Sequence, residues 1–228
     1  MLPEVGGFVY AIVPDGAGGF FVGGDFLGVG GTARRSLAHI QPNGALDLSW
    51  DPNPNFIIRA MALSGSTLYV AGEFTGVGGQ LRNGLAAIDV ATGLATAGNP
   101  NLGPIEGGTG ADSLAVVGTT VFVGGAIRHV GGQPRNGFVA LDATTGAVKF
   151  PGLTVDPTGF VHWLLAVGTT VYVGGEFKTF GGQPRSALAA IDGTTGAVLP
   201  WNPNPPTDPA GDFDIVYGMS LMGSTLYV

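Results

Sequence analysis

The chain alternates short apolar runs with glycine-rich turns, and the same alternation recurs along most of its length. Each recurrence begins with two strand-like runs, which we call pieces A and B. Piece A is apolar and occupies residues 8–13, 57–63, 113–117, 161–167 and 215–221. Piece B follows a tight turn, is β-branched and aromatic as in the run TVYVGG, and ends in two small residues. This composition favours a pleated sheet, and the small pair indicates close backbone approach or a bulge.

Two further runs complete each repeat. Piece C, as in the run ALAAI, leads three times into an Asp-x-x-Thr-Gly turn, at residues 89–93, 142–146 and 192–196. In such a turn the aspartate accepts hydrogen bonds from backbone amides two or three residues on, and the glycine can adopt a positive φ. Piece D follows and runs into Pro and Asn, as in WNPN at residues 201–204. Because proline cannot donate to a ladder, we expect piece D to be an outer edge strand.

An arginine marks the register of the repeats. It stands twelve residues after the last valine of piece B, at Arg34, Arg82, Arg135 and Arg185, with intervals of 48, 53 and 50 residues. No window has both helix caps and apolar residues at helical spacing over three turns. Four strands in a repeat of about 50 residues are typical of a β-propeller. A β-sandwich is the alternative, but a sandwich does not require near-identical copies.

The sequence therefore predicts an all-β fold, a β-propeller of four-stranded antiparallel blades with piece A innermost. We expect one domain over residues 1–228, with blades at about 5–55, 56–110, 111–159 and 160–213 and a partial blade at 214–228. The fifth repeat stops after piece B, and the chain begins with piece A. We therefore expect a fragment of a longer propeller that is an incomplete ring here. Further blades would come from the same chain or, in an oligomer, from another chain.

Composition limits the possible functions. The net charge is −7 and the pI about 4.6, which makes nucleic acid and anionic membranes poor partners. Cysteine is absent, so the chain has neither disulfides nor thiol chemistry. The first residues lack the basic and apolar segments of a secretion signal. No stretch reaches the roughly eighteen apolar residues of a membrane span, so membrane insertion is not expected.

The segment VGGDFLGVGGTARRSLAHIQPNGALD, residues 22–47, resembles the delta-60 repeat. That repeat is a domain of unknown function found in β-propellers of bacterial surface and secreted proteins. The resemblance covers essentially the whole chain and implies a propeller at the cell surface or outside the cell, with no established catalytic residues. Residues 192–201 are also similar to quinoprotein-type propeller repeats. Here, however, a GGQxR element is inserted, and the adjacent cysteine pair of those dehydrogenases is absent.

A carboxylate stands nine residues before the arginine in three repeats. The pairs are Asp25 with Arg34, Glu73 with Arg82, and Glu176 with Arg185. They flank the connection between pieces B and C, so we expect ion pairs across a hairpin or bonds from arginine to nearby carbonyl groups. A group that recurs in every blade indicates a structural role rather than a unique site. In the third repeat Ala126 replaces the acid, so Arg135 must bind another acceptor or face solvent.

Metal and cofactor motifs are sparse. His39, His129 and His162 share no ligand spacing, so a zinc site is not expected. The run Asp212-Phe213-Asp214 superficially resembles a calcium loop without the spacing of an EF-hand, and calcium is the one cofactor left open. No glycine-rich segment lies between a strand and a helix as a phosphate loop requires. We predict no catalytic, cofactor-binding or metal-binding residues.

Loop variation places the predicted binding face. In a propeller the D–A and B–C loops share one face, and here the D–A loops differ between copies while the other turns are uniform. A ring of identical loops cannot form a unique site, so we expect the binding face on the D–A side. Its candidate residues are Glu106, Asp112, Arg128, His129, Asp156, Lys178, Asp208, Asp212 and Asp214.

These observations predict a non-catalytic extracellular repeat scaffold that binds a protein or a glycan. The alternative is a propeller enzyme, quinoprotein-like or of another kind, whose active site is missing from this segment or unrecognised in it. An enzyme needs convergent titratable groups with a geometric role, and spacing along the sequence does not show such a group.

Overall fold

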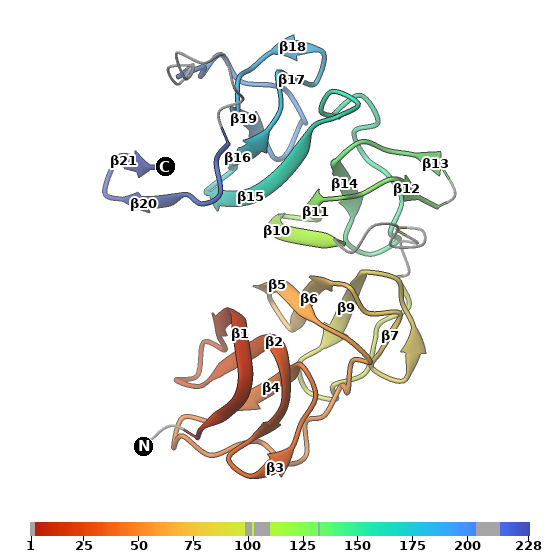
Figure 1. The fold of residues 1–228 in the computed structure, drawn as a ribbon, viewed down its shortest axis with the longest axis vertical. Helices are drawn as coiled ribbons and strands as arrows, with labels where there is room; N and C mark the ends of the chain where they lie inside the picture. The colour runs from red at the N-terminus through yellow and green to blue at the C-terminus, as the bar shows by residue number, and fades with distance from the viewer. Residues whose placement is uncertain (1–2, 99–101, 103–109, 132, 204–214) are drawn as a thin grey trace.

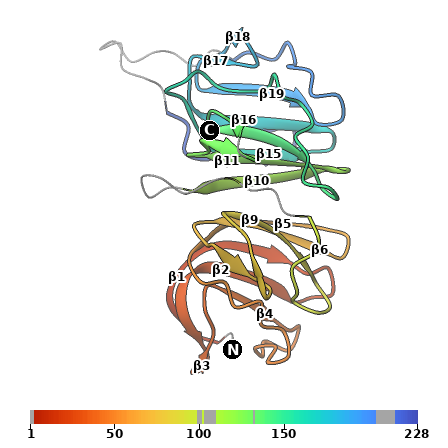
Figure 2. The ribbon, with the colours of Figure 1, turned by 90° about the vertical axis from the view of Figure 1, so that its right-hand side faces the viewer.

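The computed structural model describes residues 3–98, 102, 110–131, 133–203 and 215–228. This described part contains strands and turns but no helix. Its antiparallel sheets stand side by side around an open ring, as the blades of a β-propeller (Figure 1). Seen from the side, the sheets stack from the first blade at the bottom to the fourth at the top (Figure 2). The predicted all-β propeller, with the start of a fifth repeat, is confirmed.

Each blade has three main strands. The inner strands are β1 (Val5–Pro14), β5 (Ile58–Ser64), β10 (Ala111–Val117) and β15 (Phe160–Val167). The middle strands are β2 (Phe20–Val29), β6 (Thr67–Gly72), β11 (Thr120–Gly125) and β16 (Thr170–Glu176). The outer strands are β4 (Leu37–Ile40), β9 (Leu85–Asp89), β14 (Phe138–Asp142) and β19 (Leu188–Asp192). Each middle strand pairs antiparallel with both neighbours, so these strands correspond to pieces A, B and C.

The connection from the middle to the outer strand forms a small hairpin. In the first blade β3 (Thr32–Ala33) pairs with the end of β2. The others are β7 (Gly76–Val77) with β8 (Gln80–Leu81), β12 (His129–Val130) with β13 (Gln133–Pro134), and β17 (Thr179–Phe180) with β18 (Gln183–Pro184). The fifth repeat contributes the hairpin of β20 (Ser220–Met222) and β21 (Thr225–Tyr227).

Piece D forms a single bridge with each outer strand. The bridges are Ile40–Leu46, Ile88–Ala95, Leu141–Val148 and Ile191–Val198. In three blades an arginine Nη2 donates to the carbonyl of the residue after the bridge: Arg34 to Asp47 at 3.2 Å, Arg82 to Thr96 at 2.7 Å and Arg185 to Leu199 at 3.0 Å. The fourth strand of each blade is thus reduced to a bridge, and in these three blades the guanidinium group satisfies the carbonyl that follows the bridge.

The Asp-x-x-Thr-Gly turns form as predicted. In the fourth blade Asp192 Oδ1 accepts from the amides of Thr195 at 2.8 Å and Thr194 at 2.9 Å, and Gly196 has a φ of 75°. These backbone bonds hold the pKa of Asp192 below its usual value. The aspartates of the second and third blades bind their turns in the same way.

The apolar core lies between the blades. Between the third and fourth blades, Phe122 and Phe138 pack with Val161 and Val171, and all four side chains are buried. Equivalent clusters fill the spaces between the first and second blades and between the second and third. The apolar side chains that stabilise the ring are therefore those buried between neighbouring sheets.

The first small residue of each pair at the end of a middle strand sets the distance to the next blade. An added Cβ atom would lie 2.7 Å from Ile58 at Gly23, 2.5 Å from Val161 at Gly124 and 2.7 Å from Val216 at Gly174. In the second blade the residue is Ala71, and the equivalent residue of the next inner strand is Ala111. Both alanines are buried. A glycine on one blade is thus matched by valine or isoleucine on the next, whereas Ala71 is matched by the smaller Ala111. The combined size of the two side chains therefore stays similar, as dense packing requires.

Gly124→Ala should destabilise the fold by about 1–3 kcal/mol, because the added methyl group overpacks against Val161. Adding Val161→Ala should recover part of that loss, since the double variant reproduces the alanine pair found one blade earlier. A double-mutant cycle of urea unfolding free energies measures the coupling. Simple addition of the two losses would show that this contact does not set the blade spacing.

Candidate functional site

Every inner strand contains a β-bulge at the same position. The register with the middle strand shifts between Val9 and Ala11, Ile58 and Ala60, Ala111 and Ser113, and Val161 and Trp163. The extra residues are Tyr10, Arg59, Asp112 and His162. A bulge leaves one residue outside the ladder and redirects its side chain. The four strands therefore present four different side chains from one equivalent place.

The second small residue of each pair in the middle strands is glycine in all four blades, and it lies against this bulge. A Cβ atom on Gly24 would be 2.0 Å from the carbonyl oxygen of Phe8. The equivalent distances are 2.1 Å from Gly72 to Ile57, 2.3 Å from Gly125 to Gly110, and 2.1 Å from Gly175 to Phe160. Any side chain here would collide with backbone, so the glycine permits the bulge.

The fifth repeat adds one more residue to the series. Val216 packs on Gly174 as Val161 packs on Gly124, so Tyr217 corresponds to His162. We call the set of Tyr10, Arg59, Asp112, His162 and Tyr217 the inner-strand arc. Its first four residues belong to β1, β5, β10 and β15, and these strands lie along the inner side of the open ring (Figure 1).

Neighbouring members of the arc interact in chain order. The Arg59 guanidinium lies 5.6 Å from the centre of the Tyr10 ring, and Arg59 Nε lies 3.5 Å from Asp112 Oδ1. The ring centres of His162 and Tyr217 are 5.2 Å apart. Side chains far apart in the sequence thus meet in two groups, Tyr10 with Arg59 and Asp112, and His162 with Tyr217. Tyr10 and Tyr217 remain 47% and 69% exposed.

Two carboxylates share the one guanidinium of the arc. Arg59 donates to Glu73 Oε1 from Nε at 2.7 Å and also from Nη2. Burial raises the pKa of Asp112; the positive charge of Arg59 and the proximity of His162 oppose this rise, and Glu73 adds to it. The side chains of Arg59 and Asp112 are 29% and 24% exposed, so solvent or a ligand can reach them.

The predicted binding-face residues are only partly brought together. Asp112 belongs to the arc, and Arg128 lies 5.7 Å from the ring centre of Phe160, which stacks with His162. His129 is exposed in β12. Asp156 accepts from the amides of Lys178 and Thr179 at 2.7 and 3.2 Å, so it fixes its own loop to the hairpin that follows β16. Glu106, Asp208, Asp212 and Asp214 lie outside the described residues, and so does the proposed calcium run.

Of the two expectations for the repeat arginines, bonds to nearby carbonyl groups form at Arg34, Arg82 and Arg185, whereas among the described residues the ion pair with the acid nine residues earlier does not. Glu73 binds Arg59 rather than Arg82, because its side chain is directed to the inner strand and Arg82 points to piece D. Arg34 pairs with Asp51 at 2.6 Å rather than with Asp25. No ion pair joins Arg185 to Glu176 within the described ranges; Arg185 binds Gln183 and the carbonyls of Pro184 and Leu199. Arg135 occupies the equivalent position and is half-buried.

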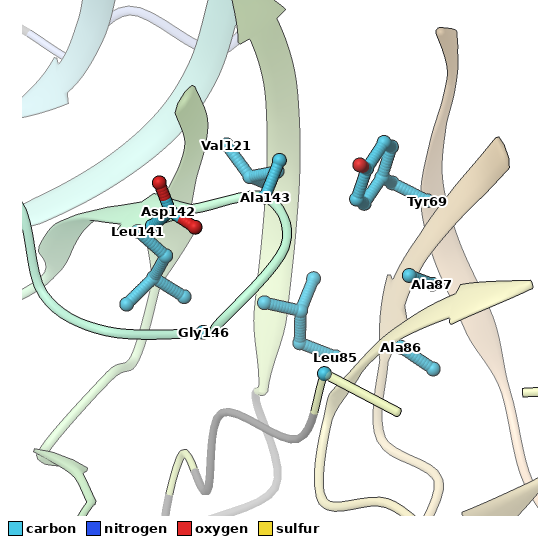
Figure 3. Close-up of a pocket in the computed structure, with 10 residues that line it drawn as sticks. Tyr69, Leu85, Ala86, Ala87, Val121, Leu141, Asp142, Ala143 and Gly146 are labelled. Atoms are coloured by element: carbon cyan, nitrogen blue, oxygen red, sulfur yellow. The ribbon is translucent and has the colours of Figure 1, made fainter. Parts of the chain in front are cut away.

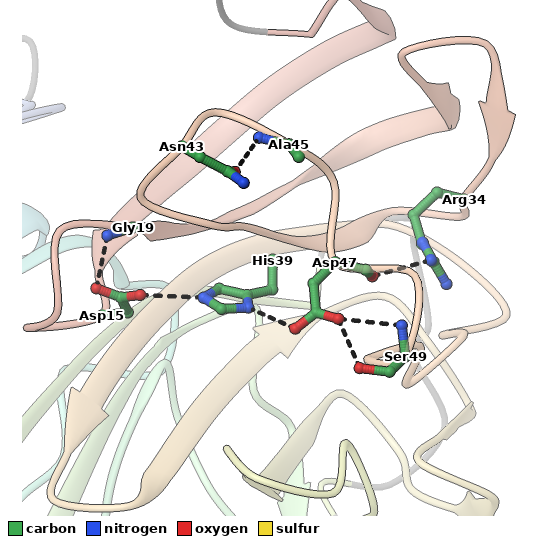
Figure 4. Close-up of polar contacts among 8 residues, drawn as sticks. All are labelled: Asp15, Gly19, Arg34, His39, Asn43, Ala45, Asp47 and Ser49. Atoms are coloured by element: carbon green, nitrogen blue, oxygen red, sulfur yellow. Dashed lines mark hydrogen bonds and ion pairs between the residues drawn. The ribbon is translucent and has the colours of Figure 1, made fainter.

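The first blade has a polar clamp where the other blades have alanine. His39 Nε2 lies 3.1 Å from Asp15 Oδ2 and Nδ1 lies 3.1 Å from Asp47 Oδ2 (Figure 4). The hydrogen bond to His39 is the main cause that lowers the pKa of Asp15. Burial acts to raise the pKa of Asp47, but bonds from Ser49 and His39 outweigh it. The imidazole ring of His39 also stacks on Phe21, with the ring centres 4.7 Å apart. His39 thereby links the turn at Asp15, the outer strand and piece D of this blade.

An apolar pocket lies between the second and third blades (Figure 3). Tyr69, Leu85, Val121 and Leu141 line it, with the Asp142 carboxylate at its edge. Gly98 stands here at the sequence position that Trp50 and Trp201 occupy in the first and fourth blades, and in the third blade Phe150 stands one residue earlier. The cavity volume of about 20 Å³ is far below the roughly 300 Å³ at which ligand pockets begin. We therefore interpret it as a packing gap left by the missing aromatic ring.

Comparison with known proteins supports the architecture. No protein-family model matches the chain. No curated protein matches it either. Two crystal structures of the extracellular domain of BT4673 from B. thetaiotaomicron superpose with TM-scores of 0.55 and 0.56 at 12% identity, over 96% of this chain. The WD40 domain of Neurospora crassa Pan2 superposes with a TM-score of 0.50 at 14% identity, over 84% of this chain.

These likenesses show a shared propeller fold. The chain spans 25% of the length of the BT4673 domain and 50% of the Pan2 domain. Within the residues that the structure describes, no helix is long and apolar enough to cross a membrane. The same residues contain no group of three His, Asp or Glu side chains placed to hold a metal ion.

Arg34→Ala should lower the free energy of unfolding by about 1.5–3 kcal/mol, because it removes a charged hydrogen bond to a carbonyl at the edge of the sheet. Arg35→Ala is the matched control, since the adjacent side chain is exposed and its loss should change stability by no more than about 0.5 kcal/mol. Chemical denaturation of both variants measures the difference. If the two substitutions lower the free energy of unfolding equally, Arg34 does not stabilise the attachment of piece D.

Proposed function

We propose that this chain is a non-catalytic interaction module of an extracellular protein, and that the inner-strand arc is its recognition surface. One observation carries the proposal: the bulge position has a different side chain in each of the four blades, Tyr10, Arg59, Asp112 and His162, and tyrosine recurs in the fifth repeat as Tyr217. The residue before it is apolar or small in all of them: Val9, Ile58, Ala111, Val161 and Val216. A repeating frame that presents unrelated groups at one place can build a surface of low symmetry, as a specific site requires.

The chemistry of the arc suits binding. Tyrosine and arginine combine large contact area with polar groups and are enriched in recognition surfaces. Here they flank a partly exposed carboxylate and an imidazole ring.

The extracellular setting has two supports. The repeat resembles those of surface and secreted proteins, and the BT4673 structures with the same fold are an extracellular domain. The acidic surface and the lack of cysteine are compatible with that setting. Protein and glycan ligands both fit the proposal at this level.

A thermal-shift screen of small metabolites, peptides and oligosaccharides tests the surface. We expect a ligand that raises the melting temperature of the wild type and has no effect on Asp112→Asn or Arg59→Gln. His129→Ala, an exposed change in β12, is the control and should retain the response. A ligand that still stabilises both arc variants but not His129→Ala would place recognition on the loops instead.

A further inference from the structure

We propose that the inner-strand arc binds a primary alkylammonium group, with the Asp112 carboxylate as its counter-ion and the rings of His162 and Tyr217 beside it. The inference rests on the proposed function, because it names the ligand class of the same surface. An alkylammonium group can belong to a free amine or to a lysine side chain of a partner protein.

Asp112 offers an acceptor that the described chain leaves largely unused. Its contact with Arg59 Nε is 3.5 Å, which is longer than a hydrogen bond. An ionised carboxylate has about four lone-pair sites, and an ammonium group brings about three donors. Burial raises the pKa of this carboxyl group even though the positive charge of Arg59 opposes the rise. A bound ammonium group would add a second positive charge that opposes it.

The charge balance of the arc favours a cation over an anion. Arg59 directs two of its nitrogens to one oxygen of Glu73, so its charge is already matched. Asp112 is a second carboxylate, and no further guanidinium group of the arc balances its negative charge. An incoming phosphate or carboxylate would have to displace Glu73 and approach Asp112, whereas an ammonium group meets one unmatched negative charge.

The rings of the arc suit the rest of such a ligand. The Arg59 guanidinium over the Tyr10 ring shows that a cation already lies on an aromatic face in this surface. His162 is the bulge residue of the next blade after Asp112, and its ring lies 5.2 Å from the ring of Tyr217, which is 69% exposed. An alkyl chain can pack on this ring while its charged end reaches the carboxylate.

An NMR titration at low ionic strength with n-butylammonium tests the proposal, with n-butanol and butyrate as the uncharged and anionic probes. We expect saturable shifts with butylammonium alone. Asp112→Asn should weaken binding about tenfold or more, the equivalent of one charged contact. Tyr217→Ser should also weaken it, and this exposed substitution cannot act by unfolding the core. Glu4→Gln removes an exposed carboxylate outside the arc and should bind like the wild type.

A lysine source is tested with Nα-acetyl-lysine methylamide. Tighter binding of this probe than of butylammonium identifies a protein partner, the reverse order identifies a free amine, and either order supports the inference. Equal binding of butanol, tighter binding of butyrate, or full affinity in Asp112→Asn would overturn it. If no amine binds while another ligand depends on the arc, only this inference is wrong; if no ligand at all depends on the arc, the proposed function is wrong as well.

Discussion

The two small residues at the end of each middle strand are the constraint on which the rest of the structure depends. The first lets the next blade place an apolar side chain directly on the strand, at positions such as Gly124 against Val161. The second lets a carbonyl of the blade's own inner strand approach to a distance that no Cβ atom allows. Blade spacing and bulge are therefore set by adjacent residues. The side chain that leaves the ladder follows the residue that packs on the neighbouring blade, so a well-fixed contact holds the base of each arc residue.

This arrangement separates the parts of the repeat that stabilise from the part that can vary. Arg34, Arg82 and Arg185 bind piece D through the same carbonyl position, and the Asp-x-x-Thr-Gly turns close three of the blades in the same way. Neither feature can distinguish one blade from another. The bulge position carries little of the packing, so phenol, guanidinium, carboxylate and imidazole groups are all tolerated there. A repeat fold can thus hold one asymmetric surface without disturbing its core.

The sequence predicts those features that depend on local chemistry. Alternating apolar residues, glycine pairs and aspartate turns identify the strands, their order and the propeller, because each signal acts within one hairpin. The arginine partners are not predictable in this way. Glu73 lies at hairpin distance from Arg82, yet a bulge on a different strand brings Arg59 to it. The arc leaves one signal in the sequence, a position near the start of piece A that holds four different residue types over the five repeats. Whether the arc residues lie close together depends on how the blades are arranged around the ring, and the spacing along the sequence does not show this arrangement.

The central claim is that recognition takes place on the inner strands and not on the variable loops. The most direct measurement is a map of backbone amide shifts in the assigned NMR spectrum when a stabilising ligand is added. The account predicts perturbations at the five bulge-equivalent segments, residues 9–11, 58–60, 111–113, 161–163 and 216–218. Perturbations confined to the loops at 126–131 and 152–159, with the inner strands unchanged, would contradict it.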